Sequence, residues 1–598
     1  MKQVQEIVNI LDGEGAARFW RRLLMVLTVV CFVGFYDVRE YHNFSAPEAM
    51  DAAQLARNIA DGKGYVTDNI RITAAMMVAE RNGGDYCLKG NQPDIVNPPL
   101  YPMLLAGVMR YVLLDWVKTG DSSRNVDEFT IAILNQLLLI LAAILTYRLG
   151  RRLFDPGVGL FAAIVFFFNY QVWQFSVSGL PNMLSMVILL FLFRSLLLFN
   201  EGNMPDGAEA DIIPTDLPGV WWTLWRGGCI GFILGAAMLN QYALGWLFLP
   251  VFFFMAFTAR PGRKFIAILA VVVVFAAVVA PWIVRNCMVS GMPFGLATYA
   301  PFADTVALPG DMYERVLTAN VFALHGPEFW DLQYKVTTTL AEVFSKSIPT
   351  LGGNWITFCF IAGILLPFMC RGLNSARAFV IFGILMLAIA QACTKTMLSA
   401  NSNAITSENL IVLFIPLVTI FGSAYIYTVI EQINYGLPLI RKMIIGAAGV
   451  VLCLPMILAL MPPEQPTMAY PPYYPKGVVQ VSELFDRNDV IASDMPHAVA
   501  WYGRRQCFNL PLDSEKEFYQ ISDLVYPING VYLTQLTIDR KFISEFGTTG
   551  TSWGNFATKL LTRGEIKSGF PLRSIMGDML PEQILITDWE RWRVAPRE

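Results

Sequence analysis

Two acidic residues, Glu48 and Asp51, stand three positions apart just beyond the first apolar run of the chain. Pro47 is typical of a first helical turn, and Gly62 and Gly64 are typical of a helix end, so the segment predicts a helix of about four turns. Because residues three apart share a helical face, the two carboxylates can take a proton from an acceptor hydroxyl or hold a cation. The alternative is a pair of N-terminal charges that only complement the helix dipole.

Two further polar motifs are candidates for chemistry. Asn97 opens the run Asn-Pro-Pro-Leu-Tyr-Pro, and Arg285 and Asn286 close the run Pro-Trp-Ile-Val-Arg-Asn. Taken alone, the first run is a turn fixed by proline. The arginine of the second run stands where an apolar helix ends, so it can bind a phosphate or extend its head group to the membrane interface.

The composition indicates that much of the protein surface faces something other than water. Of the 598 residues, 55% are hydrophobic and 15% are charged, whereas soluble proteins carry roughly 25% charged residues. The mean hydropathy of +0.48 agrees, and the formal net charge of -3 gives no case for binding nucleic acid. Most of the nine cysteines lie in apolar runs as small hydrophobes; Cys87 and Cys507 lie in polar segments and could pair.

Apolar segments long enough to cross a membrane recur along the first 461 residues. A bilayer core of about 30 Å needs roughly 20 apolar residues in each helix. The sequence predicts about eleven spans, near residues 23–36, 129–147, 158–177, 182–199, 221–239, 243–258, 265–284, 355–370, 377–394, 409–430 and 443–461.

The distribution of Lys and Arg orients these spans, since cytoplasmic loops carry the excess of positive charge. Eleven spans with a cytoplasmic N-terminus place every basic cluster inside, at Arg148/Arg151/Arg152, Arg260/Arg263/Lys264, Arg371/Arg377 and Arg441/Lys442. Counting the apolar stretch 100–117 as a further span would reverse every later loop. We therefore expect that stretch to lie in the outer interface.

This topology predicts an all-α polytopic membrane domain over residues 1–461 and a soluble α/β domain over 462–598 on the extracytoplasmic face. Outer loops are expected at 37–128 and 285–353. In the C-terminal domain, alternating short patterns predict two strands and two helices. They lie at Val490–Asp494, Gly530–Leu536, 478–486 and 496–502.

The order of these elements resembles the type C glycosyltransferase (GT-C) superfamily. The resemblance rests on the acidic helix after the first span, the Pro-Pro-Leu-Tyr entry to an interfacial helix, Gly-Arg-Arg-Leu-Phe154 and the Pro-Trp-x-x-Arg-Asn run. The chain is similar to the bacterial dolichyl-phosphate-mannose-protein mannosyltransferase-like branch, akin to the aminoarabinose lipid A transferases. The resemblance covers roughly residues 20–460.

The resemblance implies an enzyme of the bacterial inner membrane that takes a sugar from a polyprenyl-phosphate donor and passes it to a lipid, glycan or protein on the outer face. The family's usual Asp falls at Glu48, and its usual His before the double proline falls at Asn97. Asp51 is therefore slightly favoured over Glu48 as the base. The implied donor-binding residues are Arg57, Asn97, Tyr101, Arg285, Asn286 and Lys395.

Other functions stay open at this point. No cofactor is implied with certainty; a divalent metal is compatible with the loops, although no compact Asp-x-Asp motif appears in them. A secondary transporter should carry charges in mid-membrane, whereas the candidate charges here collect in outer loops. A non-catalytic membrane assembly protein is the other alternative.

Overall fold

The computed structural model describes the chain over residues 14–84, 91–111, 126–203, 219–324, 326, 329–353, 355–365, 371–394, 405–433, 438–462, 473–538, 552–563, 566, 569–576 and 583–593. Within these residues, eight helices are long and apolar enough to cross a membrane. They are α2 (Glu14–Glu40), α6 (Val126–Leu153), α9 (Asn182–Asn203), α10 (Val220–Asn240), α12 (Lys264–Ser290), α18 (Arg371–Thr394), α19 (Ile415–Gln432) and α20 (Pro438–Ala459).

The three other expected spans are broken or short. Helices α7 (Pro156–Phe167) and α8 (Tyr170–Val177) form a pair bent by 54°; α7 ends at its C-cap Phe168, and Asn169 caps the start of α8. Residues Tyr242–Thr258 contain a 3₁₀ turn followed by α11 (Phe248–Thr258). A second bent pair joins Phe329–Thr350 to α17 (Trp355–Leu365) at 104°. Length and composition thus support eight to ten spans over the described residues, and the count of eleven is not confirmed.

Close helix packing in the bundle depends on small residues, as is common in membranes. Helices α10 and α12 are the clearest case, since a Cβ atom on Gly231 would lie 2.5 Å from the carbonyl oxygen of Val271. A Cβ atom on Gly227 would likewise meet Ala270 at 2.9 Å. The two backbones therefore approach more closely than any larger side chain would allow.

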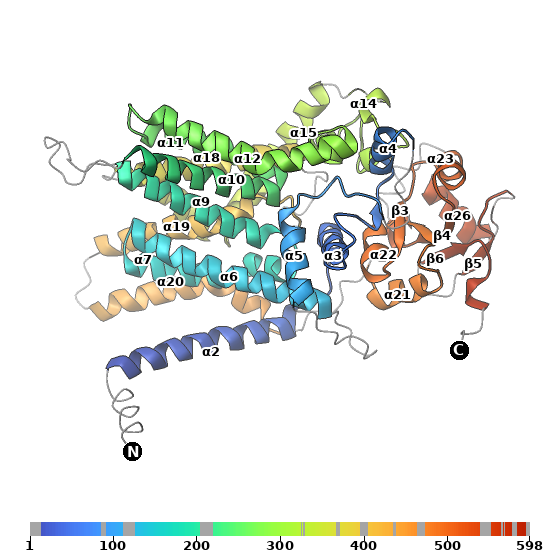
Figure 1. The fold of residues 1–598 in the computed structure, drawn as a ribbon. Coiled ribbons are helices and arrows are strands. Elements are labelled where there is room, and N and C mark those ends of the chain that lie inside the picture. Colours follow the sequence, from blue (N-terminus) through green and yellow to red (C-terminus); the bar gives the residue numbers. More distant parts are fainter. Residues whose placement is uncertain are drawn as a thin grey trace, which may run out of the picture.

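Two short helices close one end of the bundle (Figure 1). The helix α5 (Leu100–Tyr111) runs across the direction of the long helices, and its 12 residues are too few to span a bilayer. This agrees with the interfacial helix expected at 100–117, of which 112–117 lie outside the described residues. Helix α3 (Pro47–Ala60) begins at Pro47, as expected, and packs against α5 on one side and α22 (Pro496–Tyr502) on another.

The C-terminal part folds around a six-stranded sheet of order β1-β3-β2-β4-β6-β5. Strands β2 (Val490–Ser493), β3 (Gln506–Asn509) and β4 (Ile528–Leu533) run parallel. β6 (Ile584–Thr587) runs antiparallel to β4, and β5 (Ser574–Met576) runs antiparallel to β6. The expected strands at β2 and β4 are confirmed. So are the expected helices, at α21 (Pro475–Glu483) and α22.

One strand of this sheet comes from the other half of the chain. β1 (Asn69–Ile70), which follows α3 in the chain, pairs in parallel with β3, so that Asn69 lies opposite Cys507 and Ile70 opposite Phe508. Cys507 is buried there, and Cys87 lies outside the described residues. The following helix α4 (Ile72–Arg81) packs against α12 and α13 (Met312–Arg315). The segment from β1 to α4 thereby contacts both the bundle and the sheet.

Candidate active site

Asp51 is the centre of a buried polar network at the end of the bundle. Its side chain is 2% exposed and accepts four hydrogen bonds. One carboxylate oxygen accepts from Nδ2 of Asn69 at 3.0 Å and Nε2 of Gln54 at 3.3 Å. The other accepts from Nη2 of Arg71 at 2.9 Å and Nδ2 of Asn97 at 3.0 Å. Both oxygens are therefore committed to described donors.

Arg71 balances two carboxylates. It directly follows β1, so pairing of that strand with β3 fixes its position beside α3. Its Nη2 atom contacts Asp51, and its Nε atom donates to Glu314 of α13 at 2.9 Å. Burial alone would raise the pKa of Asp51, but the Arg71 charge and the amide donors of Asn97 and Asn69 together hold that pKa below its ordinary value. Asp51 is a fixed anion.

Asp94 forms the turn that presents Asn97. Its carboxylate accepts from the backbone N–H groups of Val96 at 3.0 Å and Asn97 at 2.8 Å, and from the Asn97 side chain at 3.1 Å. An acidic residue three positions before the Asn-Pro-Pro run is the sequence signal for such a side-chain-capped turn. Sequence analysis missed Asp94, and it also missed Asn69, Arg71 and Glu314.

Arg285 reaches this turn from the last two turns of α12. Its Nη1 atom donates to the carbonyl oxygen of Asp94 at 2.5 Å, and its guanidinium lies 4.8 Å from the ring centre of Trp282. No carboxylate of the described residues forms an ion pair with it, in contrast to Arg71. Arg285 therefore contributes a positive charge that its hydrogen bonds do not neutralise.

The turn is held from its other side by Gly295. This residue has φ +53°, and a Cβ atom on it would lie 2.1 Å from the carbonyl oxygen of Ile95. The backbone N–H of Leu296 donates to that same oxygen at 3.2 Å. Only glycine permits this approach, which fixes residues 94–97 against the loop after α12.

Glu48 lies one helical turn before Asp51 and is less constrained. The side chain is half-buried, and its Oε2 atom is shielded from solvent with no hydrogen-bond partner among the described residues. Burial raises the pKa of Glu48, its own backbone N–H partly opposes the rise, and the Asp51 charge adds to it. The two acidic residues thus shift in opposite directions, as carboxylate pairs with separate roles do.

The C-terminal domain contributes an aromatic pair to the same region. Tyr473 Oη lies 2.6 Å from Nε2 of His497, the second residue of α22. Burial lowers the pKa of His497 to about 4, although the nearby Asp51 charge opposes the change. His497 is therefore neutral at physiological pH. Sequence analysis gave no sign of either residue, because Tyr473 lies just before α21, His497 lies at the start of α22, and only the fold brings them together.

The structure brings some of the expected donor-binding residues together and separates others. Asn97, Arg285 and Asn286 belong to the Asp51–Asp94 network, with Asn286 Oδ1 accepting from Arg285 at 2.9 Å. Arg57 instead donates to the carbonyl oxygens of Ala500 and Trp501 at 2.7 and 2.8 Å, joining α3 to α22. Tyr101 is buried and donates to the carbonyl oxygen of Gly179 at 2.8 Å. Lys395 lies outside the described residues.

The described part of the chain contains no group of three or more His, Cys, Asp or Glu side chains that could hold a metal ion. The divalent metal left open by the sequence therefore stays untested.

Solved structures share this architecture. The archaeal oligosaccharyltransferase AglB from Archaeoglobus fulgidus, in complex with an inhibitory peptide and a dolichol-phosphate, matches 88% of this chain and 71% of its own, at 10% identity and a TM-score of 0.54. ArnT from Cupriavidus metallidurans, bound to undecaprenyl phosphate, matches 96% of this chain and 98% of its own, at 12% identity and a TM-score of 0.52. The chain thus has a GT-C-like fold, as the resemblance predicted.

Sequence comparison adds nothing to this likeness. No protein-family model matches the chain, and no curated protein matches it in sequence. At 10–12% identity the structural match establishes the fold alone. The multi-pass membrane character follows from that fold and from the apolar helices.

Proposed function

We propose that this protein is a membrane glycosyltransferase that moves a sugar from a polyprenyl-phosphate donor to a hydroxyl-bearing or amide-bearing acceptor. The observation that carries the proposal is the Asp51 network, which gathers two carboxylates of opposite pKa shift and an un-neutralised arginine at one end of a GT-C-like bundle. Two proteins of similar fold are in complex with dolichol-phosphate and with undecaprenyl phosphate. A third structure carries a tethered acceptor peptide.

The geometry favours Glu48 over Asp51 as the proton acceptor. A general base must have a lone pair that is not already used, and four hydrogen bonds occupy the carboxylate oxygens of Asp51. The Oε2 atom of Glu48 has no hydrogen-bond partner among the described residues, and a raised pKa makes its carboxylate the stronger base. Asp51 then holds Arg71, Asn69 and Asn97 in place as a positioning residue.

Arg285 is suited to the leaving phosphate. As the acceptor oxygen bonds to the anomeric carbon, the bond from that carbon to the phosphate oxygen breaks and the electron pair leaves with the lipid phosphate. Glu48 takes the acceptor proton in the same reaction. The growing negative charge on the phosphate needs a cation that is not already paired. Arg285 meets this condition, whereas Arg71 is held between Asp51 and Glu314.

The proposed location is the outer face of a bacterial inner membrane. The Asp51 network and the C-terminal sheet lie at one end of the bundle (Figure 1). The opposite end carries the helix termini with Arg151, Arg260 and Arg441, and such basic ends are cytoplasmic by the positive-inside rule. In single-cysteine variants, a reagent added from outside should label a cysteine that replaces Asp513 but not one that replaces Asn374. This result would support the orientation. The reverse pattern would contradict it.

The direct test is transfer by the purified full-length protein in lipid nanodiscs. Undecaprenyl phosphates carrying radiolabelled hexoses or pentoses are supplied with a lipid, glycan or peptide acceptor, and release of undecaprenyl phosphate is measured. Assays with EDTA, Mg²⁺ or Mn²⁺ test whether transfer requires a divalent metal. We expect release that depends on Glu48. Failure with every donor, from a folded protein, would favour the transporter or assembly alternatives.

A further inference from the structure

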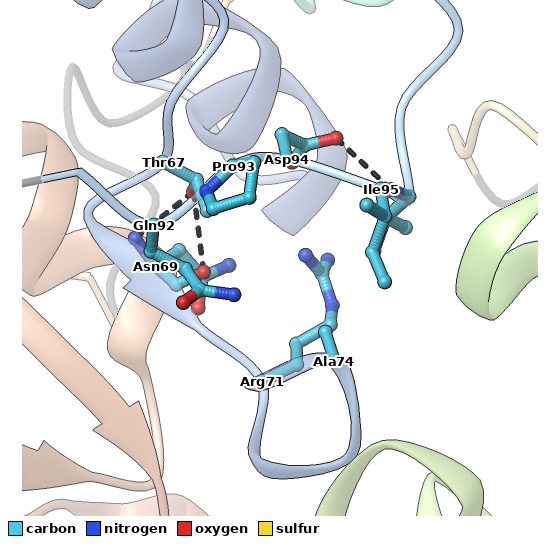
Figure 2. A pocket seen from close by; sticks show the side chains of 9 residues that line it. Thr67, Asn69, Arg71, Ala74, Gln92, Pro93, Asp94 and Ile95 are labelled. Atoms are coloured by element: carbon cyan, nitrogen blue, oxygen red, sulfur yellow. Dashed lines mark hydrogen bonds between the residues drawn. The ribbon is translucent and has the colours of Figure 1, made fainter. Parts of the chain in front are cut away.

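A small hollow lies directly beside the Asp51 network (Figure 2). Asn69 and Arg71, at either end of β1, face the segment that contains Gln92 and Asp94 across it. The hollow measures about 10 Å³, which suits one group the size of a water molecule. It belongs to the first outer loop alone and is separate from the Glu48 carboxylate.

The hollow contains buried polar atoms that no described residue satisfies. Gln92 is 1% exposed, and neither its Nε2 nor its Oε1 atom has a hydrogen-bond partner among the described residues. The same holds for Oδ1 of Asn69, which is 3% exposed. Because burying an unpaired polar group costs free energy, three such atoms around one hollow indicate a site made for a partner.

The backbone holds Gln92 rigidly in this position. Its carbonyl oxygen accepts from the N–H of Thr67 at 2.8 Å, and the N–H of Asp94 donates to the carbonyl oxygen of Tyr65 at 3.1 Å. Arg285 donates to the carbonyl oxygen of Asp94, two residues further along the chain. The backbone that carries the Gln92 side chain therefore does not need to be ordered when a partner arrives, which favours binding.

The available atoms define the chemistry of that partner. Gln92 offers two N–H donors and one acceptor, and Asn69 offers a further acceptor, so the partner must both donate and accept. A phosphate anion only accepts hydrogen bonds, so the Asn69 and Gln92 oxygens and the Asp94 carboxylate would oppose its binding. Arg71 would not compensate, because two carboxylates already balance its charge. A neutral hydroxyl fits both requirements and the size.

We infer that this hollow binds one hydroxyl group of the transferred sugar, with Gln92 as the residue that recognises it. The inference rests on the proposed function and deepens it, since it names a specificity determinant within the donor sugar. Asn69 links the hollow to the reaction centre, because it lines the hollow and its Nδ2 atom donates to Asp51. A sugar with that hydroxyl in place would therefore be aligned with the reacting groups.

The experiment compares the undecaprenyl-phosphate sugar that the wild-type protein uses with its single-deoxy forms. In the wild type, we expect one deoxy donor to lose about 10- to 100-fold in kcat/KM, as expected for buried polar groups left unpaired. Gln92→Leu should lower kcat/KM for the parent donor by a similar factor and make the two donors equal. Gln92→Met repeats the test with an unbranched side chain.

Gln506→Leu is the matched control. Gln506 is also a buried amide with an unpartnered Nε2 atom among the described residues, but it lies on β3 and outside the hollow. It should retain the full wild-type discrimination. The inference is overturned if the wild type discriminates against no deoxy donor, or if discrimination survives in Gln92→Leu or Gln92→Met. A wild type inactive with every donor overturns the proposed function itself, which is a distinct result.

Discussion

Asp51 and Glu128 are two buried carboxylates at the same boundary between the helix bundle and the C-terminal domain, and their surroundings differ. Asp51 is 2% exposed and is bound by an arginine and three side-chain amides. Glu128 is 0% exposed; it accepts from Nε1 of Trp501 at 2.8 Å and from the backbone N–H of Phe44 at 3.3 Å. No described lysine or arginine forms an ion pair with Glu128.

The difference separates a joint from a reaction centre. The two hydrogen bonds to Glu128 connect α6 to α22 and to the segment before α3. Both donor groups, the Trp501 indole N–H and the Phe44 backbone N–H, are satisfied by these contacts. Around Asp51, in contrast, Glu48, Asn69 and Gln92 retain buried atoms without a described partner. Burial of an acid alone is thus a poor sign of function. Unsatisfied polar groups beside a charged network are a better one.

The largest effect that we expect from this comparison is the loss of transfer rate in Glu48→Gln. Loss of a general base should lower the rate of sugar transfer by about 10²–10⁴-fold. Because Glu48 has no described hydrogen-bond partner at Oε2, the thermal midpoint should hardly change. Single-turnover transfer and differential scanning fluorimetry measure the two quantities. Full transfer by this variant would remove Glu48 from the reaction.

Arg285→Met is next, and Arg57→Met is its matched control. Both guanidiniums donate to backbone carbonyls and stack on a tryptophan, Arg285 on Trp282 and Arg57 on Trp501. If Arg285 stabilises the leaving phosphate, its loss should cost about 10²–10³-fold in kcat. Arg57→Met should lower the thermal midpoint and leave the donor KM unchanged. A raised donor KM in Arg57→Met would instead restore Arg57 as a donor-binding residue.

Asp51→Asn should affect stability as well as rate. The variant leaves Arg71 with Glu314 alone, and breaking one partner of a buried ion pair costs about 3 kcal/mol or more. Asn97 and Asn69 also lose a charged acceptor, so transfer should fall, but by less than in Glu48→Gln. Adding Arg71→Gln should cost further stability, but less than it costs in the wild type, because it then leaves only Glu314 unpaired and not both carboxylates. Purely additive losses in this double-mutant cycle would argue against the coupling.

The two carboxylates also predict opposite pH behaviour. The folded-state pKa of Glu48 lies above its ordinary value of 4.5, so the folded state holds that proton more tightly and loses the associated stability as pH rises. Asp51, with a lowered pKa, contributes stability above about pH 3.8 that is lost as pH falls further. Transfer should rise about 10-fold per pH unit until Glu48 is ionised. The pH dependence of kcat/KM, measured in the wild type and in Asp51→Asn, tests this prediction. An inflection below pH 4.5 in the wild type that stays unchanged in Asp51→Asn would contradict it.

The sequence predicts the parts of this site that depend on local pattern. Hydropathy finds the long helices, and Pro47 with the paired glycines marks α3 to within a few residues. The rest depends on contacts between distant segments. β1 has two residues, too few for any strand pattern, yet it places both Asn69 and Arg71 on Asp51.

The hydrogen-bond partner that a polar side chain finds in the fold also cannot be predicted from its sequence motif alone. Arg57, Tyr101 and Arg285 are alike in sequence terms, as polar residues beside apolar helices. Trp501 and Gly179 supply backbone partners for the first two, which only the folded chain reveals. Glu314 similarly stands 243 positions from Arg71.

The smallest effect on transfer is expected from Glu128→Gln, which tests the comparison from the structural side. The variant keeps the shape of the side chain, but an amide nitrogen in place of one oxygen meets either the Trp501 indole N–H or the Phe44 N–H, and both are donors. One buried donor is then left unpaired, at a cost of about 1–3 kcal/mol. Because this joint holds α22 and not the Asp51 oxygens, kcat and KM should stay within about 2-fold of wild type below the unfolding transition. Chemical denaturation and transfer assays on the same preparation measure both quantities. A loss of transfer comparable to that of Glu48→Gln, with stability unchanged, would show that Glu128 takes part in the reaction and would remove the distinction drawn between the two carboxylates.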